Sequence, residues 1–405
     1  MRIKLYIPYL FFMTGLFLSC SSKSGLHVDN NGVDTINLDN ASQRDSILLS
    51  TIVDEPEVII LETKDNCIIR EIRAMEVYDN RIYILDDLSS SMLVFSRDGS
   101  FVSKIGERGR GHGEYLELAD FSIDRENNVI YLWDETLNTV FIYDIQTKKY
   151  ISEIEIKNNN AKSFCLLYFD NHLYLNRTSK NDDDKGFDII KIDLKTRQQC
   201  ASYLNSEEYN NGWKYPMRLP CSFFYSKNTN TPKYIGAFSD KIFAITPNDI
   251  MPKYHVQCKD FIDRKEVEEL KAVIKSKEYV YDLSSLYAKE PVFMISNLHE
   301  MKGMLTFQFM KDRLYNVFHN DDTGETFYTA DLENDYIGYS NNFATNFTFS
   351  DEYGIYGILS ENQIPRFVDE VVNNNRLNPH IDKYDKLLKV QNDSNPIIFY
   401  YKYKK

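Results

Sequence analysis

The densest group of side chains that could bind a ligand lies in a glycine-rich run at residues 106 to 115. The run reads Gly106-Glu107-Arg108-Gly109-Arg110-Gly111-His112-Gly113-Glu114-Tyr115. A phosphate-binding loop needs a helix after its glycines, because the aligned amides at the helix start hold the anion, and no Lys-Ser or Lys-Thr pair follows this run. Glu114 would also repel a phosphate. The pattern therefore favours a turn in which glycines adopt positive φ and Tyr115 packs between repeated units.

The candidate ligand site consists of five residues: Arg108, Arg110, His112, Glu114 and Trp133. The two arginines could meet an acidic or sugar ligand, whereas core packing is the default role for Trp133. His112 and Glu114 could supply two metal ligands, but zinc needs three or four, and the seven histidines are scattered. The acidic triplet at 182 to 184 lacks the alternation and the bidentate Glu of a calcium loop, which favours a solvated hairpin tip. We therefore predict no metal and no other cofactor.

Residues for a catalytic mechanism cannot be identified in this sequence. There is no Gly-x-Ser-x-Gly elbow, and no order of Ser, His and Asp can be defended. Among sixty acidic residues, no carboxylate pair stands out for glycosidase chemistry. Asp86 and Asp134 recur at equivalent places, where an Asp usually accepts backbone hydrogen bonds in a turn, so both are expected to be structural. These observations favour a binding protein over an enzyme but do not decide between the two.

Cys20 has the most specific chemical fate of any residue in the chain. Arg2 and Lys4 precede an almost wholly apolar stretch from Leu5 to Leu18, and Ser19 stands directly before the cysteine. A stretch of this length is typical of a secretory signal, since a membrane-spanning helix needs roughly twenty apolar residues. We predict a signal peptide at 1–19 and a diacylglycerol on the Cys20 thiol, which would anchor the chain to a membrane. The alternative is an ordinary signal peptide that ends next to a cysteine.

Residues 20–46 are rich in Ser, Asn and Asp and hold no apolar run of strand length, so we predict a flexible tether there. The net charge of −13 argues against nucleic acid as a partner, because phosphate binding needs a basic face. Aromatic residues make up 14% of the chain, which favours strands with aromatic cross-strand pairs.

An internal repeat organises the rest of the sequence. Residues 78 to 105 and 126 to 154 align with an offset of 48. Each copy contains a strand, an Asp, a polar turn, a second strand, another turn and a third strand. With the strand that precedes each copy (74 to 78 and 120 to 124), each unit makes four antiparallel strands, which is one blade of a β-propeller.

Weaker copies of the unit continue to the end of the chain. Strands are predicted at 171–175 and 187–194, at 233–237, 241–246 and 253–257, at 312–317 and 326–331, and at 346–349 and 354–359. Strands 58–61 and 396–401 remain, and their pairing in the last blade would close the ring. We therefore predict an all-β fold at 47–405, a six-bladed β-propeller of four-stranded antiparallel blades closed by N- and C-terminal strands. Two helical inserts at 263–277 and 363–390 are expected on one rim.

The glycine-rich run, followed by residues 121–124 and 128–134, resembles an NHL-type propeller repeat. The whole mature chain resembles the six-bladed β-propeller lipoproteins of gut Bacteroidetes, with a lipoprotein signal, a Gly-Arg-Gly-x-Gly-Glu-Tyr turn and Asn395-Pro396 before the last strand. The match is specific over 70–156, and His112 stands where the family commonly has Pro. Surface-exposed lipoproteins of that group usually carry acids directly after the cysteine, whereas the first acid here is Asp29. The resemblance therefore implies an outer-membrane anchor facing the periplasm.

Three functions remain open on these observations. The first is a membrane-anchored, non-catalytic scaffold that binds a protein or glycan ligand. The second is a propeller enzyme of the lactonase type that acts on a sugar or lactone. The third is an envelope sensor or assembly partner. The oligomeric state cannot be read from the sequence.

Overall fold

The two strongest repeat copies fold as consecutive four-stranded blades. The computed structural model describes residues 27–28, 32–157, 161–179, 186–215, 222–225, 229–273, 284–338 and 342–404. Blade 1 contains β6 (Ile72–Tyr78), β7 (Arg81–Asp86), β8 (Ser91–Ser96) and β9 (Phe101–Ile105). Blade 2 contains β10 (Leu118–Asp124), β11 (Val129–Asp134), β12 (Thr139–Asp144) and β13 (Tyr150–Glu155). All neighbouring strands within each blade are antiparallel, as predicted.

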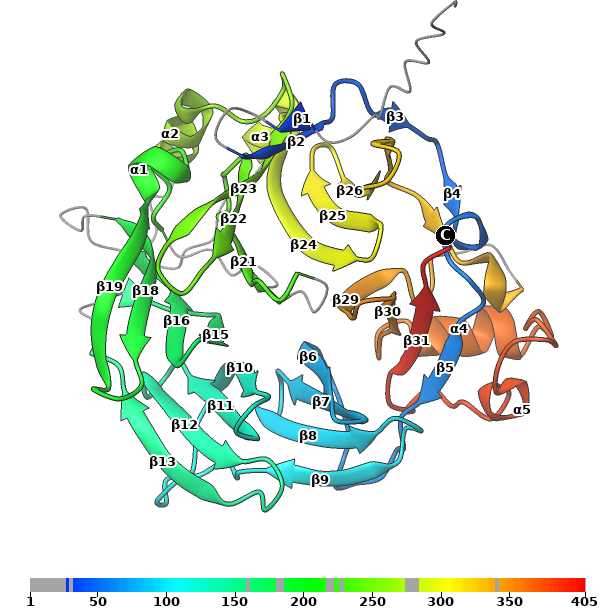
Figure 1. Cartoon of the computed structure of the whole chain (residues 1–405). Coiled ribbons are helices and arrows are strands. Elements are labelled where there is room, and N and C mark those ends of the chain that lie inside the picture. Colours follow the sequence, from blue (N-terminus) through cyan, green and yellow to red (C-terminus); the bar gives the residue numbers. More distant parts are fainter. Residues whose placement is uncertain are drawn as a thin grey trace, which may run out of the picture.

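The weaker copies form the next three blades of the ring (Figure 1). Blade 3 contains β15 (Leu166–Phe169), β16 (His172–Asn176), β18 (Phe187–Asp193) and β19 (Gln198–Asn205). Blade 4 contains β20 (Phe223–Phe224), β21 (Lys233–Ile235), β22 (Lys241–Ile245) and β23 (Ile250–Gln257). Blade 5 contains β24 (Phe293–Met301), β25 (Met304–Met310), β26 (Leu314–Asn320) and β27 (Thr326–Thr329). A separate pair, β14 (Ala161–Lys162) and β17 (Thr178–Ser179), lies beside blade 3.

Blade 6 is assembled from both ends of the propeller sequence. It contains β29 (Asn346–Ser350), β30 (Gly354–Leu359), β31 (Ile397–Lys402) and β5 (Glu57–Ile60), in that order. The two closing strands lie side by side and antiparallel, with Val58 opposite Phe399 (Figure 1). The predicted closure is therefore confirmed, together with the six-bladed all-β fold.

The segment before β5 pairs with the outer strands of blades 4 and 5 and with a strand outside the blades. β2 (Asp34–Asn37) pairs with β23, β3 (Ser42–Gln43) with β27, and β4 (Ile47–Leu48) with β28 (Leu332–Glu333), all in parallel. A short strand β1 (His27–Val28) is antiparallel to β2. We call residues 34–53 the N-terminal strap. The predicted tether at 20–46 is therefore too long, since the folded part already includes the strands before residue 46. These short strands form because the unpaired edges of β23, β27 and β28 accept them.

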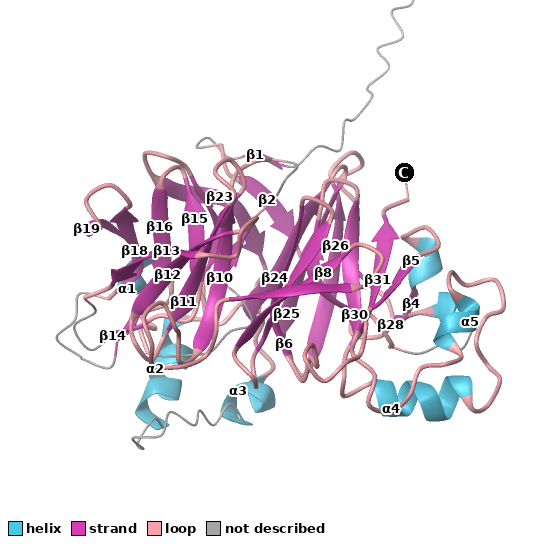
Figure 2. Cartoon of the chain, turned by 90° about the horizontal axis from the view of Figure 1, so that it is seen from below, coloured by secondary structure: helices cyan, strands magenta, loops and turns pink. Residues whose placement is uncertain are grey.

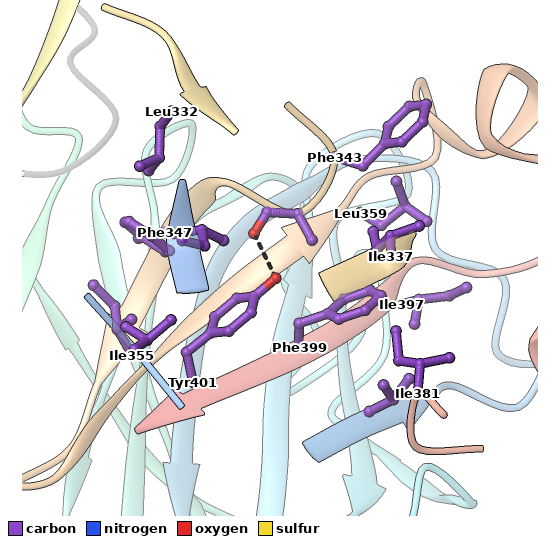
Figure 3. Packing of buried hydrophobic residues seen from close by; sticks show 14 of the residues in the cluster. Leu332, Ile337, Phe343, Phe347, Ile355, Leu359, Ile381, Ile397, Phe399 and Tyr401 are labelled. Atoms are coloured by element: carbon purple, nitrogen blue, oxygen red, sulfur yellow. Dashed lines mark hydrogen bonds between the residues drawn. The ribbon is translucent and has the colours of Figure 1, made fainter. Parts of the chain in front are cut away.

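The hydrophobic core is divided among the seams between blades. One cluster places Ile59 and Ile398 of blade 6 against Ile84 and Phe95 of blade 1. The largest cluster lies around blade 6, where Tyr401 donates a hydrogen bond to the carbonyl of Ala344 over 3.3 Å (Figure 3). Because each blade buries its faces against its neighbours, ring closure is required for a complete core.

Helices α2 (Arg264–Val273), α3 (Ser284–Lys289) and α4 (Ile364–Phe367) lie toward one face of the ring (Figure 2). α1 (Ser206–Tyr209) follows blade 3, and α2 and α3 lie between blades 4 and 5. α4, a short π-helix (Val368–Val372) and α5 (Tyr384–Leu387) form the insert in blade 6. Two 3₁₀ turns lie at Leu49–Thr51 and Asp335–Ile337. Both predicted helical inserts are confirmed where the structure describes them. In the described part of the chain, no helix is long and apolar enough to cross a membrane.

Candidate functional site

The glycine-rich run is a turn between blades 1 and 2, as predicted. Gly106 and Gly113 adopt φ of 69° and 75°, and a Cβ on Gly113 would lie 2.8 Å from the ring of Tyr150. The hydroxyl of Tyr143 donates to the carbonyl of Gly113. Tyr115 is buried in the cluster that joins the two blades. The glycines therefore serve the close packing of this seam.

Three of the four predicted polar ligand residues line a hollow on the periphery of blade 2. The hollow measures about 460 Å³ and is lined by Arg110, His112 and Glu114 together with Glu153 and Glu155 of β13. Arg108, which does not line it, is also exposed. The carboxylate of Glu114 accepts the N–H of Gly111 over 2.6 Å, which closes the turn on itself. None of these residues lines the cavity on the ring axis.

Trp133 lies elsewhere, in the seam between blades 2 and 3. Its side chain is fully buried, and its indole N–H donates to the carbonyl of Ser163 over 2.9 Å. Because the indole of Trp133 has no exposed surface, this residue cannot belong to a ligand site with the four residues of the turn. Its role is core packing. Cys20 and the acidic triplet at 182–184 lie outside the described residues.

The recurrent aspartates organise the turns, as predicted. Asp86 accepts the N–H groups of Arg70 and Glu71, each over 2.8 Å. Asp134 accepts those of Leu116 and Glu117 over 2.6 and 3.1 Å. Both carboxylates therefore fix the chain that enters their blade.

The ring encloses a cavity of about 530 Å³ on its axis, which we call the channel. All six innermost strands contribute to its wall, namely β6, β10, β15, β20, β24 and β29 (Figure 1). Its polar residues include Arg73, Glu76, Asp120, Ser122, Arg125, Tyr168, Tyr225, Asn297, His299, Gln308, Asn346 and Thr348. Sequence reasoning missed them because they are distributed over all six blades and lie far apart in the sequence. The first strand of every repeat copy could have indicated these residues, because the first strand of each propeller blade lies next to the axis.

Side chains connect the innermost strands of blades 2 and 3. The carboxylate of Asp120 accepts the N–H of Leu166 over 2.8 Å, and the hydroxyl of Ser122 accepts the N–H of Tyr168 over 2.9 Å. Burial raises the pKa of Asp120 well above its usual range. This group is therefore held toward its neutral form in the channel wall.

A second connection joins blades 5 and 6. The amide of Asn297 donates to the carbonyl of Phe347 over 2.7 Å, and Nδ1 of His299 lies 3.2 Å from the hydroxyl of Ser350. Burial lowers the pKa of His299 to about 4, so this imidazole is neutral at physiological pH.

Two arginines connect blades 1 and 2. Nε of Arg73 donates to the carbonyl of Ala119 over 3.2 Å. Nη2 of Arg125 lies 2.7 Å from Oε2 of Glu76, and its guanidinium covers the rings of Tyr78 and Tyr225 at 5.4 and 5.3 Å. The channel wall is thus held by contacts between blades, and a ligand would meet a surface that is already ordered.

Metal chemistry receives no support from the arrangement of side chains. Within the described ranges, no three His, Cys, Asp or Glu side chains come together in a way that could hold a metal ion.

The closed ring of six blades around an axial cavity defines the chain as a six-bladed β-propeller. The chain belongs to the family described as a domain of unknown function, DUF4934, which it matches over residues 33–402. No curated protein matches the sequence.

Solved structures support the fold. A protein from Bacteroides fragilis, described as exported, is 19% identical with a TM-score of 0.74, and the match covers 92% of this chain and 100% of that one. A member of the DUF4221 family from Bacteroides vulgatus is 11% identical with a TM-score of 0.51, over 87% and 98% of the two chains. At these identities the likeness concerns the fold alone. The resemblance to NHL-type repeats and to lipoproteins stays a prediction.

Proposed function

We propose that this protein is a non-catalytic binding propeller, held at a bacterial envelope membrane by lipid on Cys20, and that its ligand occupies the axial channel. The observation that carries the proposal is the cavity of about 530 Å³ to which all six blades contribute. This volume falls within the range of about 300–1,000 Å³ that is usual for small-molecule sites.

The character of the wall supports binding rather than simple packing. Polar groups such as Asn346 and Arg73 alternate with the partly exposed rings of Phe169 and Phe224. Apolar walls with a few placed polar groups are typical of ligand sites, where the polar groups give orientation. The contacts between blades hold this wall in place, which reduces the entropy lost on binding.

A variant that fills the channel tests the proposal. Asn346 is exposed and lines the cavity from β29, so Asn346→Trp would place an indole in the channel with little cost to the core. A panel of small metabolites and glycan fragments is screened by thermal shift against the original protein and this variant. Ligands that stabilise the original protein should lose most of their effect on Asn346→Trp. Equal shifts for both proteins would place the site outside the channel.

The proposed address rests on the sequence of the first twenty residues and agrees with the description of the Bacteroides fragilis protein as exported. Expression of the full chain in a Bacteroides host with an alkyne fatty acid should label the protein and place it in the membrane fraction. Cys20→Ala should remove both the label and the membrane association. A membrane-bound but unlabelled protein would reject the lipid anchor.

A further inference from the structure

Arg73 is the cationic group of the channel with the most unused binding capacity. It stands near the start of β6, is partly buried and lines the cavity. Its Nε donates to the carbonyl of Ala119, and neither Nη1 nor Nη2 has a hydrogen-bond or ion-pair partner among the described residues. A guanidinium carries five N–H donors in a fixed fork, so four of them remain for a ligand.

The carboxylates nearby do not cancel this charge. Asp120 is buried and accepts the N–H groups of Phe121 and Leu166 over 2.9 and 2.8 Å. Burial raises the pKa of Asp120 by more than the attraction of Arg73 lowers it. Glu76 is paired with Arg125 over 2.7 Å. The guanidinium of Arg73 therefore keeps a positive field inside a partly enclosed site, where such a field is stronger than in water.

The exposed acids of the cavity lining lie toward the other end of the channel. Glu126 and Asp170 follow the last residues of β10 and β15, whereas Arg73 is the second residue of β6. The innermost strands of a propeller run in the same direction along the axis, so their first residues lie toward one end of the cavity and their last residues toward the other end. The two ends of the channel thus differ in charge.

The side of the cavity across from Arg73 offers apolar surface. Phe169 and Tyr168 of blade 3 and Phe224 and Tyr225 of blade 4 line it and are partly exposed. Aromatic rings contribute large contact areas with little loss of side-chain freedom. A ligand that spans the cavity would meet these rings with one part and the Arg73 fork with another.

We propose that the channel binds an organic carboxylate, with the carboxylate paired to Nη1 and Nη2 of Arg73 and an apolar or aromatic body packed against the rings of blades 3 and 4. This inference rests on the proposed channel function. A planar guanidinium fork matches a carboxylate in a bidentate geometry, which a lysine does not reproduce. The net charge of −13 repels anions from the protein as a whole, so recognition depends on this local contact.

Two probes of equal shape and different charge test the inference. 2-Naphthoate and the neutral 2-naphthamide are titrated calorimetrically into the original protein, Arg73→Gln and Arg73→Lys. The original protein should prefer the carboxylate by about tenfold or more, as expected for a charge-assisted pair. Arg73→Gln should abolish the preference, and Arg73→Lys should keep only part of it. The double variant Arg108→Ala with Arg110→Ala removes two exposed arginines outside the channel and should bind like the original protein.

The outcomes separate the ligand class from the site. Equal affinity for both probes, no effect of Arg73→Gln, or no binding of 2-naphthoate at millimolar concentration would overturn the inference. If Asn346→Trp still abolishes binding of both probes, the channel function stands and only the carboxylate preference falls. If both probes bind Asn346→Trp as well as the original protein, the channel function itself falls.

Discussion

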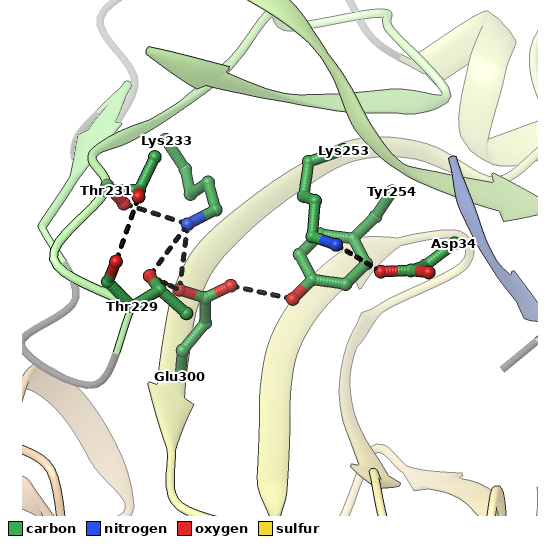
Figure 4. Close-up of polar contacts among 7 residues, drawn as sticks. All are labelled: Asp34, Thr229, Thr231, Lys233, Lys253, Tyr254 and Glu300. Atoms are coloured by element: carbon green, nitrogen blue, oxygen red, sulfur yellow. Dashed lines mark hydrogen bonds and ion pairs between the residues drawn. The ribbon is translucent and has the colours of Figure 1, made fainter. Parts of the chain in front are cut away.

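At the scale of single residues, an enclosed ion pair joins blades 4 and 5 (Figure 4). Nζ of Lys233 lies 3.0 Å from Oε2 of Glu300, and both side chains are almost fully buried. The hydroxyls of Tyr254 and Thr229 donate to the same carboxylate over 2.8 and 3.0 Å. Buried ions offset their desolvation only when such additional hydrogen bonds satisfy them. The pair therefore depends on both blades being in place.

We expect Glu300→Leu to destabilise the protein by about 3–5 kcal/mol, because it leaves the buried ammonium of Lys233 uncompensated. The double variant Lys233→Met with Glu300→Leu should recover a large part of this loss, since no charge then remains buried. Urea unfolding followed by tryptophan fluorescence provides the comparison. A double variant that is as unstable as Glu300→Leu would show that hydrogen bonds, rather than charge, hold this seam.

His299 gives the protein a specific dependence on pH. Burial lowers its pKa from 6.5 to about 4, so the unfolded chain binds a proton between these values that the folded chain does not. Stability from this group is present above pH 6.5 and decreases as the pH falls toward 4, by on the order of 3 kcal/mol in total. The raised pKa values of Asp321, about 6, and Asp188, about 8, act in the opposite direction.

The contribution of His299 is therefore measured as the difference in unfolding free energy between the original protein and a variant without this histidine. Unfolding free energies of the original protein and of His299→Asn, measured from pH 7.5 to 4.5, should converge as the pH falls, because the variant lacks this titration. His380→Asn serves as the control, since that side chain is exposed in the insert of blade 6. A constant difference across the range would refute the assignment to His299.

At the scale of elements, the N-terminal strap supplies a fifth strand to blades 4 and 5. Ile36 of β2 is completely buried and packs with Val256 of blade 4 and Leu305 of blade 5. Ile36→Ala should cost about 2–5 kcal/mol, the usual effect of a cavity in a core. Thr35→Ala, on the more exposed face of β2, should cost much less. Hydrogen exchange should show the loss of protection first in β2 and β23.

The strap and the channel show where sequence reasoning stops. The strands of blades 1 and 2 were predictable because each alternates or continues its apolar residues over five to seven positions. β3 and β4 have two residues each, so their sequence carries no periodicity, and they form strands only because β27 and β28 offer an edge. Arg73 and His299 lie more than two hundred positions apart, and only the closed ring brings them to one cavity. Asp86 and Tyr115 were predictable because their roles depend on contacts within one repeat or between two consecutive repeats.

At the scale of the whole molecule, the seam between blades 6 and 1 closes the ring. The guanidinium of Arg97, in the turn after β8, lies 5.1 and 4.7 Å from the rings of Tyr356 and Tyr400. It also pairs with Glu57 of β5 over 3.3 Å. This seam therefore depends on β31 and β5, which come from opposite ends of the propeller sequence.

A chain that ends at Asn395 lacks β31, whose first five residues are all buried. Its removal exposes β5 and β30, which both pair with it, and opens the seam with blade 1. We expect loss of the whole fold rather than a stable five-bladed remainder, because every blade buries its faces on two neighbours. Calorimetry should show no cooperative transition, and size-exclusion chromatography should show aggregation.

A chain that ends at Tyr403 keeps β31 and controls for truncation itself, and it should melt close to the original protein. A synthetic peptide of residues 395–405, added during refolding of the shortened chain, should restore the cooperative transition, because it returns the missing strand to blade 6. The persistence of a sharp transition without β31 would show that the strap and the other five blades can hold the ring on their own. Since the channel wall is made by all six blades, the same refolded complex should also recover ligand binding, which links closure of the ring to the proposed site.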